Sequence, residues 1–356
     1  MGVAANAAGV IIDPLLFPSD RIVLEHLSRD IVETRQAKGG DKTAAAAATN
    51  GSAKAAAAAA ASYKTASGET LPPAKQTIDA LRAQADAADP TFEPTVFMMY
   101  DLPDVRAFLQ ARAPGLEPYL DRYIAWARGI VRVETDVVMV THLIVYFCTC
   151  LPSALILLFV RFSWLHAVAH LVMQGWCMGP YTLLKHQHIH GRGVLVKDRA
   201  LVAAVDAVFP YIMDPLMGHT WNSYYHHHVK HHHVEGNGPD DLSSTVRYQR
   251  DSLRDFAKYV GRFLLLVWWD LPKYFITRGK WGLALRTGFW EISCYCMIAF
   301  LAKHGDTRGA VFTLVLPLAL MRLALMGGNW GQHAFVDQDE PDSDFRSSIT
   351  VIDYTV

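Results

Sequence analysis

The stretch Tyr224–Ser244, YYHHHVKHHHVEGNGPDDLSS, carries six histidines within eight consecutive positions. At helical spacing, His228, His231 and His232 form an i, i+3, i+4 pattern. Residues at these separations lie on one face of a helix, so three imidazoles are expected to converge on one point. Because neutral imidazole suits iron, zinc, copper and nickel, the pattern predicts a metal site without naming the metal.

A second group of histidines lies upstream, in HQHIH at residues 186–190. If this segment is a helix, His186 and His190 share a face and His188 points elsewhere. If it is a strand, all three share a face. The segment continues a long apolar run, so we expect a helix that leaves the apolar layer, with His186 and His190 as metal ligands.

Four apolar runs predict an all-α integral membrane protein. They cover about residues 137–160, 165–184, 283–302 and 309–326. The first run has no Lys, Arg, Asp or Glu, and it exceeds the roughly 20 residues that cross ~30 Å of hydrocarbon. Short links join the runs into two helical hairpins. Two hairpins place both histidine groups, His333 and both termini on the same side of the membrane.

The large loop between the hairpins, residues 191–282, is rich in Lys and Arg. The positive-inside rule therefore assigns this loop, with its histidines, to the cytosolic side. Within it, Phe256 to Leu271 reads as an amphipathic surface helix, because the paired Trp268 and Trp269 suit the depth of the lipid headgroups.

The N-terminal part of the chain divides into three segments before the membrane domain. Residues 1–35 form an amphipathic segment, and residues 36–90 form an alanine-rich, low-complexity linker. Residues 91–136 hold two amphipathic helices, which lie along the membrane surface or pack on the main domain. Residues 137–356 are the membrane domain. The net charge is only −1, which argues against nucleic acid as a partner.

The cysteines and one further pair of histidines are interpreted as structural and not as metal ligands. The five cysteines all fall inside apolar runs, where we expect buried thiols and neither disulfides nor zinc ligands. His166 and His170 lie one turn apart in the second run. They are either metal ligands or hydrogen-bonding partners of a neighbouring helix, and we favour hydrogen bonding.

Taken together, HQHIH at 186–190, HVKHH at 228–232 and NWGQHAF at 329–335 resemble the membrane fatty acid desaturase and hydroxylase superfamily. The resemblance covers the chain from about Val137 onward. It implies four transmembrane helices with a cytosolic helical cap, whose histidine boxes hold two irons. It also implies an O2-dependent oxidoreductase of fatty acid biosynthesis that acts on the acyl chain of a lipid or thioester. The endoplasmic reticulum is favoured over the plastid.

The resemblance implies a set of iron ligands in this sequence: His186, His190, His227, His228, His231, His232 and His333. His227 is included because it lies one turn before His231. The remaining histidines of the run, His226 and His233, are expected to be exposed or to lie behind the ligands, and His188 and His219 to be non-ligands. Asp240 and Asp241 either orient ligand imidazoles or form a turn and helix cap.

One expected motif is missing. The family carries a final histidine box after the isolated histidine, and no histidine follows His333. We expect a truncated sequence, with a degenerate relative as the alternative. No His-Pro-Gly-Gly heme motif is present, so the electron donor should be a separate cytochrome b5-like protein or ferredoxin. The alternative functions are an acyl-chain hydroxylase, a catalytically inactive homologue and, from another class, a membrane protein that binds or transports metal.

Overall fold

The computed structural model describes residues 6–12, 16, 18–37, 94–98 and 102–333, with a few single residues between them. These residues divide into two units. The first contains α1 (Pro18–Ala37), where Pro18 starts the helix and Asp20 lies in its first turn. This confirms a helix in the N-terminal segment. The predicted linker, residues 36–90, lies almost entirely outside the described residues.

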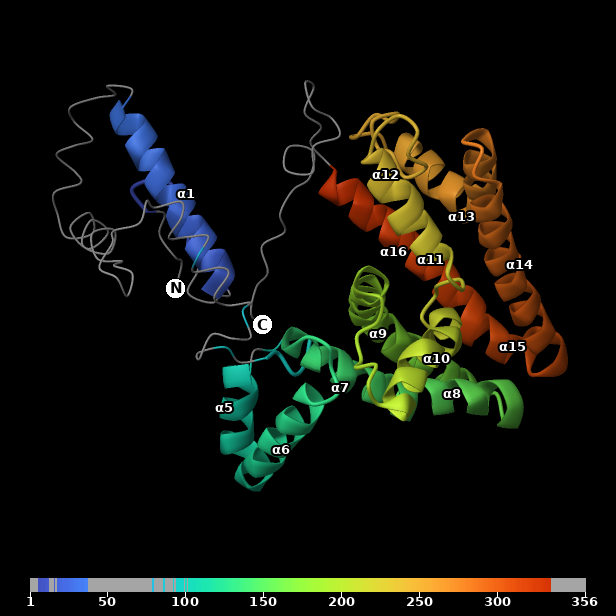
Figure 1. The fold of residues 1–356 in the computed structure, drawn as a ribbon, viewed down its shortest axis with the longest axis horizontal. Coiled ribbons are helices and arrows are strands. Elements are labelled where there is room, and N and C mark those ends of the chain that lie inside the picture. Colours follow the sequence, from blue (N-terminus) through green and yellow to red (C-terminus); the bar gives the residue numbers. More distant parts are fainter. Residues whose placement is uncertain are drawn as a thin grey trace. The chain divides into compact units, whose positions relative to one another are not determined.

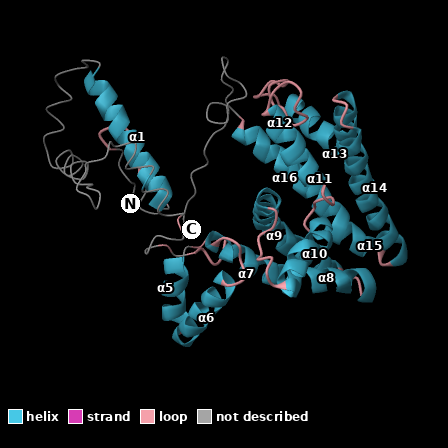
Figure 2. Ribbon diagram, in the orientation of Figure 1, coloured by secondary structure: helices cyan, strands magenta, loops and turns pink. Residues whose placement is uncertain are grey.

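In the described part of the chain, the regular secondary structure is helical without any strand (Figure 2), and an isolated bridge joins Val131 to Leu195. The all-α prediction is therefore confirmed. The second unit contains α5 (Leu102–Arg112) from Pro103 onward and α6 (Glu117–Arg128), which are the two helices predicted before the membrane domain. Arg106 of α5 joins Asp121 of α6 in an ion pair of 2.8 Å.

The first hairpin combines a segmented rod with one long helix. The rod consists of α7 (Val137–Val145), η3 (Tyr146–Cys150), α8 (Leu151–Leu155) and η4 (Ile156–Val160). The return helix is α9 (Trp164–Gly191). The η3 turn is a π-helical turn that ends two residues before Pro152. Proline has no N–H to donate and crowds the preceding turn, so a widened turn relieves the conflict.

The second hairpin repeats this arrangement. Its outgoing helix is α14 (Trp281–His304), and its return rod consists of α15 (Thr307–Ala310), η6 (Val311–Val315) and α16 (Leu316–Gln332). The π-helical η6 ends two residues before Pro317, as η3 does before Pro152. The two hairpin turns meet, because the Asp306 amide donates to the Leu158 carbonyl at 2.7 Å. Gly309 permits the approach, since a Cβ there would lie 2.3 Å from the Leu157 carbonyl oxygen.

Two rods among the described residues, Glu134–Val160 and Thr307–Gln332, are long and apolar enough to cross a membrane. The helices α9 and α14 have sufficient length, with 28 and 24 residues, but they carry more polar side chains. The structure thus supports membrane association, and the four-span topology stays a prediction.

A helical cap lies between the hairpins in sequence. It contains α10 (Ala200–Leu216), α11 (Ser223–His227), η5 (His228–His232), α12 (His233–Glu235) and α13 (Leu253–Thr277). The α13 helix is amphipathic, as predicted for its central part. It buries Leu271 and Phe275 against Ala284 of α14 and Tyr259 against Met326 of α16. Figure 1 shows α16 running from the hairpin turn to the cap.

Some smaller predictions need correction. Cys150, Cys177 and Cys294 are buried thiols as expected, whereas Cys148 and Cys296 are exposed on their helices. Arg322 is 8% exposed and forms an ion pair with Glu291 inside the second hairpin.

Candidate metal centre

The predicted first box lies at the C-terminal end of α9, which is fixed by a buried polar contact with α10. Lys185 Nζ lies 2.8 Å from Asp214 Oδ2, and both side chains are nearly inaccessible to solvent. Tyr181, one turn earlier, donates to Asp214 Oδ1 at 2.6 Å. These bonds hold the last turns of α9 in a fixed orientation, immediately before His186.

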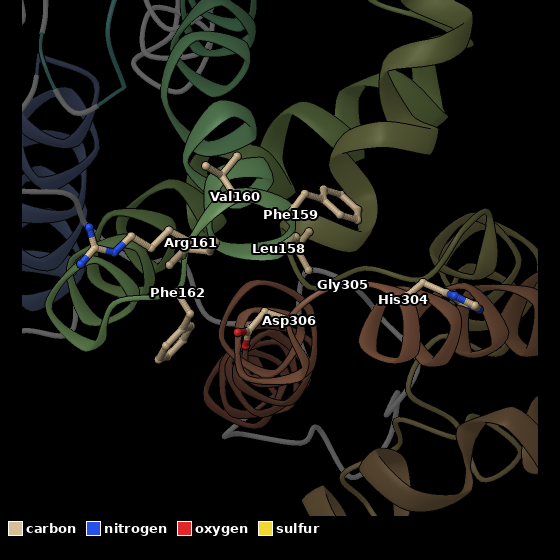
Figure 3. Close-up of a pocket in the computed structure, with 9 residues that line it drawn as sticks. Leu158, Phe159, Val160, Arg161, Phe162, His304, Gly305 and Asp306 are labelled. Atoms are coloured by element: carbon tan, nitrogen blue, oxygen red, sulfur yellow. The ribbon is translucent and has the colours of Figure 1, made fainter.

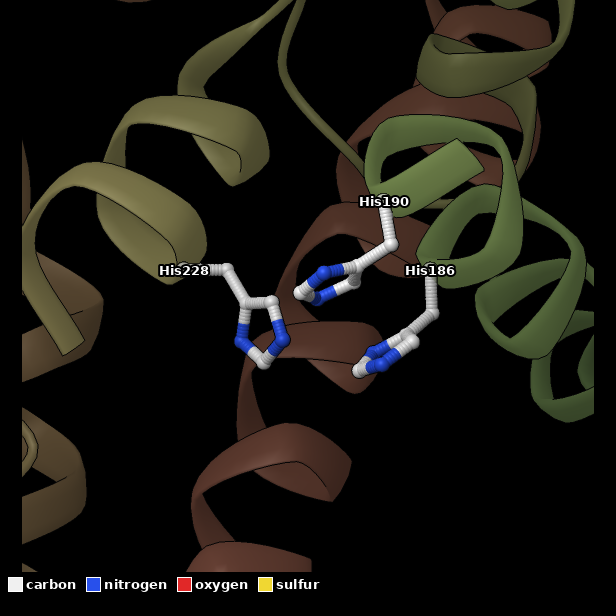
Figure 4. A group of neighbouring side chains, drawn as sticks. All are labelled: His186, His190 and His228. Carbon is white, nitrogen blue, oxygen red and sulfur yellow. The ribbon is translucent and has the colours of Figure 1, made fainter. Parts of the chain in front are cut away.

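His186 and His190 lie on one face of α9 and meet His228 from η5 (Figure 4). The ring centroids are 4.5 Å apart for His186 and His190, and 4.6 Å apart for His186 and His228. One candidate ligand nitrogen from each residue lies within 4.8 Å of the others. We call these three residues the first ligand group. The helical reading of HQHIH, with His186 and His190 on a common face, is therefore confirmed.

A second ligand group consists of His227, His231 and Asp241, whose candidate ligand atoms also lie within 4.8 Å of one another. In this group, His227 Nε2 and His231 Nδ1 are buried and have no hydrogen-bond partner. A buried polar atom without a partner is costly and calls for an explanation. A metal ion would supply the missing partner of His227 Nε2, so this donor set fits a metal.

The second box is divided between the two groups. We expected His228, His231 and His232 to converge on one point, and this expectation is wrong. The segment His228–His232 is a π-helical turn, in which the His233 amide bonds to the His228 carbonyl five residues earlier. The wider turn directs His228 toward α9 and His231 toward His227. One continuous stretch therefore contributes to two candidate metal positions.

His232 lies between the groups. Its ring centroid is 5.7 Å from that of His228 and 6.3 Å from that of His227. His333, at the end of α16, lies on the same side with its ring 6.2 Å from His232. The seven predicted ligands are thus gathered at one end of the bundle, although only five of them fall into the two ligand groups.

Asp241 orients His232. Its Oδ2 atom accepts from His232 Nδ1 at 2.6 Å and from the Asn237 amide at 3.1 Å. Its Oδ1 atom accepts from the Ser243 amide and hydroxyl at 2.8 and 2.7 Å. Burial by itself would raise the pKa of Asp241, but the nearby ring of His231 and the hydrogen bond from His232 outweigh it and hold this pKa well below its usual value. With both oxygens saturated, Asp241 serves as the carboxylate partner of an imidazole and leaves His232 Nε2 available to a metal.

Asp240 behaves differently from its neighbour. It is exposed, and it forms an ion pair with Arg278 at 2.7 Å. Of the two aspartates that the sequence offered for orienting a ligand, the structure therefore selects Asp241.

Replacing Asp241 with asparagine should weaken metal binding by roughly 10- to 100-fold, as for other carboxylates that orient ligand imidazoles. The amide keeps the size of the side chain but replaces one acceptor oxygen with a donor that opposes the surrounding N–H groups. Titration of the purified protein with Co2+ measures the change. Asp240→Asn is the matched control and should bind like the wild type. Equal affinities for both variants would contradict the orienting role.

Tyr224 is a site residue that the sequence analysis missed. Its ring stacks on His228 with a centroid distance of 5.1 Å, and its hydroxyl lies 3.5 Å from His186 Nδ1. Tyr224 therefore contacts two members of the first ligand group. Its position one helical turn before His228 could have indicated that the two side chains share a helix face.

Four histidines of the cap are in a neutral state suited to metal binding. Burial lowers the pKa of His219 and His226 to about 4, that of His227 to about 3 and that of His228 to about 2. Metals bind the unprotonated nitrogen, so these rings need not lose a proton near neutral pH. His226, expected to be exposed or behind the ligands, is buried, with Nδ1 unpartnered. His188 and His219, assigned as non-ligands, contact the Asp206 carbonyl and Thr182 respectively.

The buried His219 and His226 should make the metal-free protein less stable in acid. Their folded-state pKa of about 4 lies below the value near 6.5 of a free histidine. The unfolded chain therefore binds more protons in the window between these values. Stability is complete above the unfolded pKa and falls as the pH drops toward 4, by up to ~1.4 kcal/mol per pH unit for each group. Thermal unfolding in detergent measures it, and a midpoint unchanged between about pH 7 and pH 5 would contradict the assignment.

A hollow of about 320 Å³ lies at the opposite end of the hairpins, lined by residues 157–162 and 304–306 (Figure 3). It adjoins the start of α9, whereas His186 lies 22 residues after Trp164, or about 33 Å along the helix. This hollow is therefore separate from the histidines. The acyl channel implied by the resemblance stays a prediction.

His166 and His170, the histidine pair in the first hairpin that could have bound a metal, share a hydrogen-bond partner. His166 Nε2 and His170 Nδ1 lie 2.8 and 2.9 Å from the hydroxyl of Ser153 on the neighbouring rod. This confirms hydrogen bonding to an adjacent helix as the reading of this pair.

Comparisons of the chain with known protein families, with curated proteins and with solved structures found no match.

Proposed function

We propose that this chain is the metal-binding domain of a membrane oxidoreductase of the fatty acid desaturase and hydroxylase type. The observation that carries the proposal is the division of one histidine stretch between two adjacent ligand groups. His228 joins His186 and His190, while His227 and His231 join the residue that orients His232. Such an arrangement suits a pair of metal ions better than a single one.

Iron is the proposed metal, and two ions are expected. The ligand groups offer imidazole without thiolate, which allows iron, zinc, copper or nickel. The resemblance of the histidine boxes to those of the desaturase superfamily favours iron among these. When bound, the irons would supply the activation of O2 that oxidation of an unactivated acyl chain requires.

The proposed membrane arrangement has four spans, with α9 and α14 joining the two strongly apolar rods. Support comes from exposed apolar stripes at helical spacing. On α9 the stripe includes Leu165, Val168 and Val172, and on α14 it includes Leu285 and Phe289. Outward-facing stripes of this kind suit contact with lipid tails. The cap then lies on the side of the basic loop, which we assign to the cytosol, with the endoplasmic reticulum as the preferred membrane.

The proposed roles of the protein groups follow from this geometry. His186, His190 and His228 would hold one ion, and His227, His231 and His232 the other, with His333 close to the second set. Asp241 fixes the orientation of His232. An acyl lipid or acyl thioester would enter from the membrane. A cytochrome b5-like protein or ferredoxin would deliver electrons to the cap, near the ligand groups.

Expression of the complete reading frame in yeast tests the proposal. Total fatty acids and lipid-linked bases are profiled by gas chromatography and mass spectrometry, and iron is measured in the purified protein. We expect a new double bond or hydroxyl group in an acyl chain, together with two irons per chain. A desaturated product separates the desaturase from the hydroxylase alternative.

His304→Ala is the control variant for changes to the ligand histidines, because it removes an exposed histidine at the hairpin turns. It should leave both product and iron unchanged. Bound iron without any acyl product would favour an inactive homologue or a metal-binding protein. A wild-type protein that binds no metal would refute the proposal.

A further inference from the structure

We infer that His233 is a fourth imidazole ligand of the first metal position, beside His186, His190 and His228. The inference rests on the metal centre of the proposed function and extends its ligand set. His233 lies one residue beyond the HVKHH box, and no part of the desaturase-like pattern includes it.

The contacts of His233 place its ring against the first ligand group. Its centroid lies 4.4 Å from that of His228 and 5.0 Å from that of His190. Its Nε2 atom lies 3.0 Å from His228 Nε2. His233 therefore presents a ring nitrogen directly to a nitrogen of the group.

The distance between these nitrogens matches that of neighbouring ligands on one metal ion. Metal–imidazole bonds are about 2.1 Å long, so two such nitrogens at a right angle around one ion lie about 3.0 Å apart. A hydrogen bond between two neutral imidazoles has a similar length. The observed distance fits both shared coordination of one metal ion and a hydrogen bond between the two rings. Metal-binding experiments distinguish these two possibilities.

The π-helical turn explains why His233 reaches this position. In an α-helix, residues five apart point in directions that differ by roughly 140°. In η5 the His233 amide bonds to the His228 carbonyl, which brings residues i and i+5 onto the same side of the turn. The same widening that divides the box between two groups thus adds His233 to the first.

The two metal positions then differ in composition and access. The first would have four imidazoles, and two of its ligands, His190 and His233, are exposed to solvent. The second group includes His231 and Asp241, which are fully buried. We therefore expect the first position to exchange its metal faster than the second.

The test compares His233→Gln with His304→Gln in the purified full-length protein in detergent, with Co2+ alone as the probe. Glutamine can still hydrogen-bond to His228 but is a poor ligand for this type of ion. Loss of an orienting residue costs 10- to 100-fold in affinity, so we expect loss of a ligand to reach at least ~100-fold at one of two positions. The visible Co2+ spectrum of that position should change as well.

A His233→Cys variant distinguishes the loss of a ligand from a folding defect. Its thiolate should restore binding at the first position and add a sulfur-to-cobalt charge-transfer band. If His233→Gln binds two Co2+ ions with wild-type affinity and spectrum, His233 is a hydrogen-bonding neighbour and the inference is overturned. If the wild type binds no Co2+ and no iron, the proposed metal centre itself fails.

Discussion

Replacing His228 with alanine should remove the metal from the first position and abolish the oxidised lipid product. His228 is the member of the first ligand group that comes from the cap, and it faces His186 and His190 on α9. Without it, His186 and His190 lie on a single helix, and only the exposed His233 faces them from the cap, which is too few ligands to enclose an ion. Orienting residues already contribute 10- to 100-fold to affinity, so the loss for a ligand should be at least ~100-fold.

Metal content by mass spectrometry and lipid profiles from the same yeast cells measure the two effects together. We expect about one metal per chain in the variant, because His227 and His231 keep the second position. His304→Ala, which removes an exposed histidine from α14, should behave as the wild type. Full metal content in His228→Ala, with unchanged spectra, would remove His228 from the ligand set.

Replacing Arg322 with methionine should lower the free energy of unfolding by about 3–5 kcal/mol, the usual cost of breaking a buried ion pair. Arg322 pairs with Glu291, and both are almost completely buried. Its guanidinium also donates to the Leu264 carbonyl at 3.2 Å and to the Tyr295 hydroxyl at 2.8 Å. The variant leaves the Glu291 carboxylate buried without its counter-charge and loosens the contact between α13 and α16.

Reversible unfolding in mixed detergent micelles measures this change. The double variant Glu291→Gln/Arg322→Met should recover most of the lost stability, because it removes both charges together. Arg308→Met is a matched control at an exposed ion pair with Asp306, where the expected loss is below ~1 kcal/mol. A loss of similar size at both arginines would show that burial of the Arg322 pair is unimportant.

The local features of the fold were readable from the sequence. Apolar runs and short polar links predicted the helices and hairpin turns, because hydropathy and turn residues act over a few neighbouring positions. The i, i+4 spacing of His186 and His190 placed them on one face of α9. The gathering of both boxes and His333 at one end followed from hairpin connectivity alone.

The partition of the second box depended on a departure from regular helix. The sequence HVKHH gave no sign that its backbone would form a π-helical turn. Such turns are rare, and the cap must stabilise one by tertiary contacts, among them the bond from the Leu242 amide to His231 Nε2 at 2.8 Å. A one-residue change in periodicity was enough to send His228 and His231 to different groups and to bring in His233.

The sequence by itself determined which residues are able to bind metal, which segments are helical and which are apolar enough for a membrane. Only the tertiary structure decided how the candidate ligands are shared, that Asp241 and not Asp240 orients His232, and that Arg322 pairs with Glu291 inside the bundle. The physical reason is that these choices join residues from different helices. They depend on buried hydrogen bonds and charges whose partners are fixed only when the helices pack.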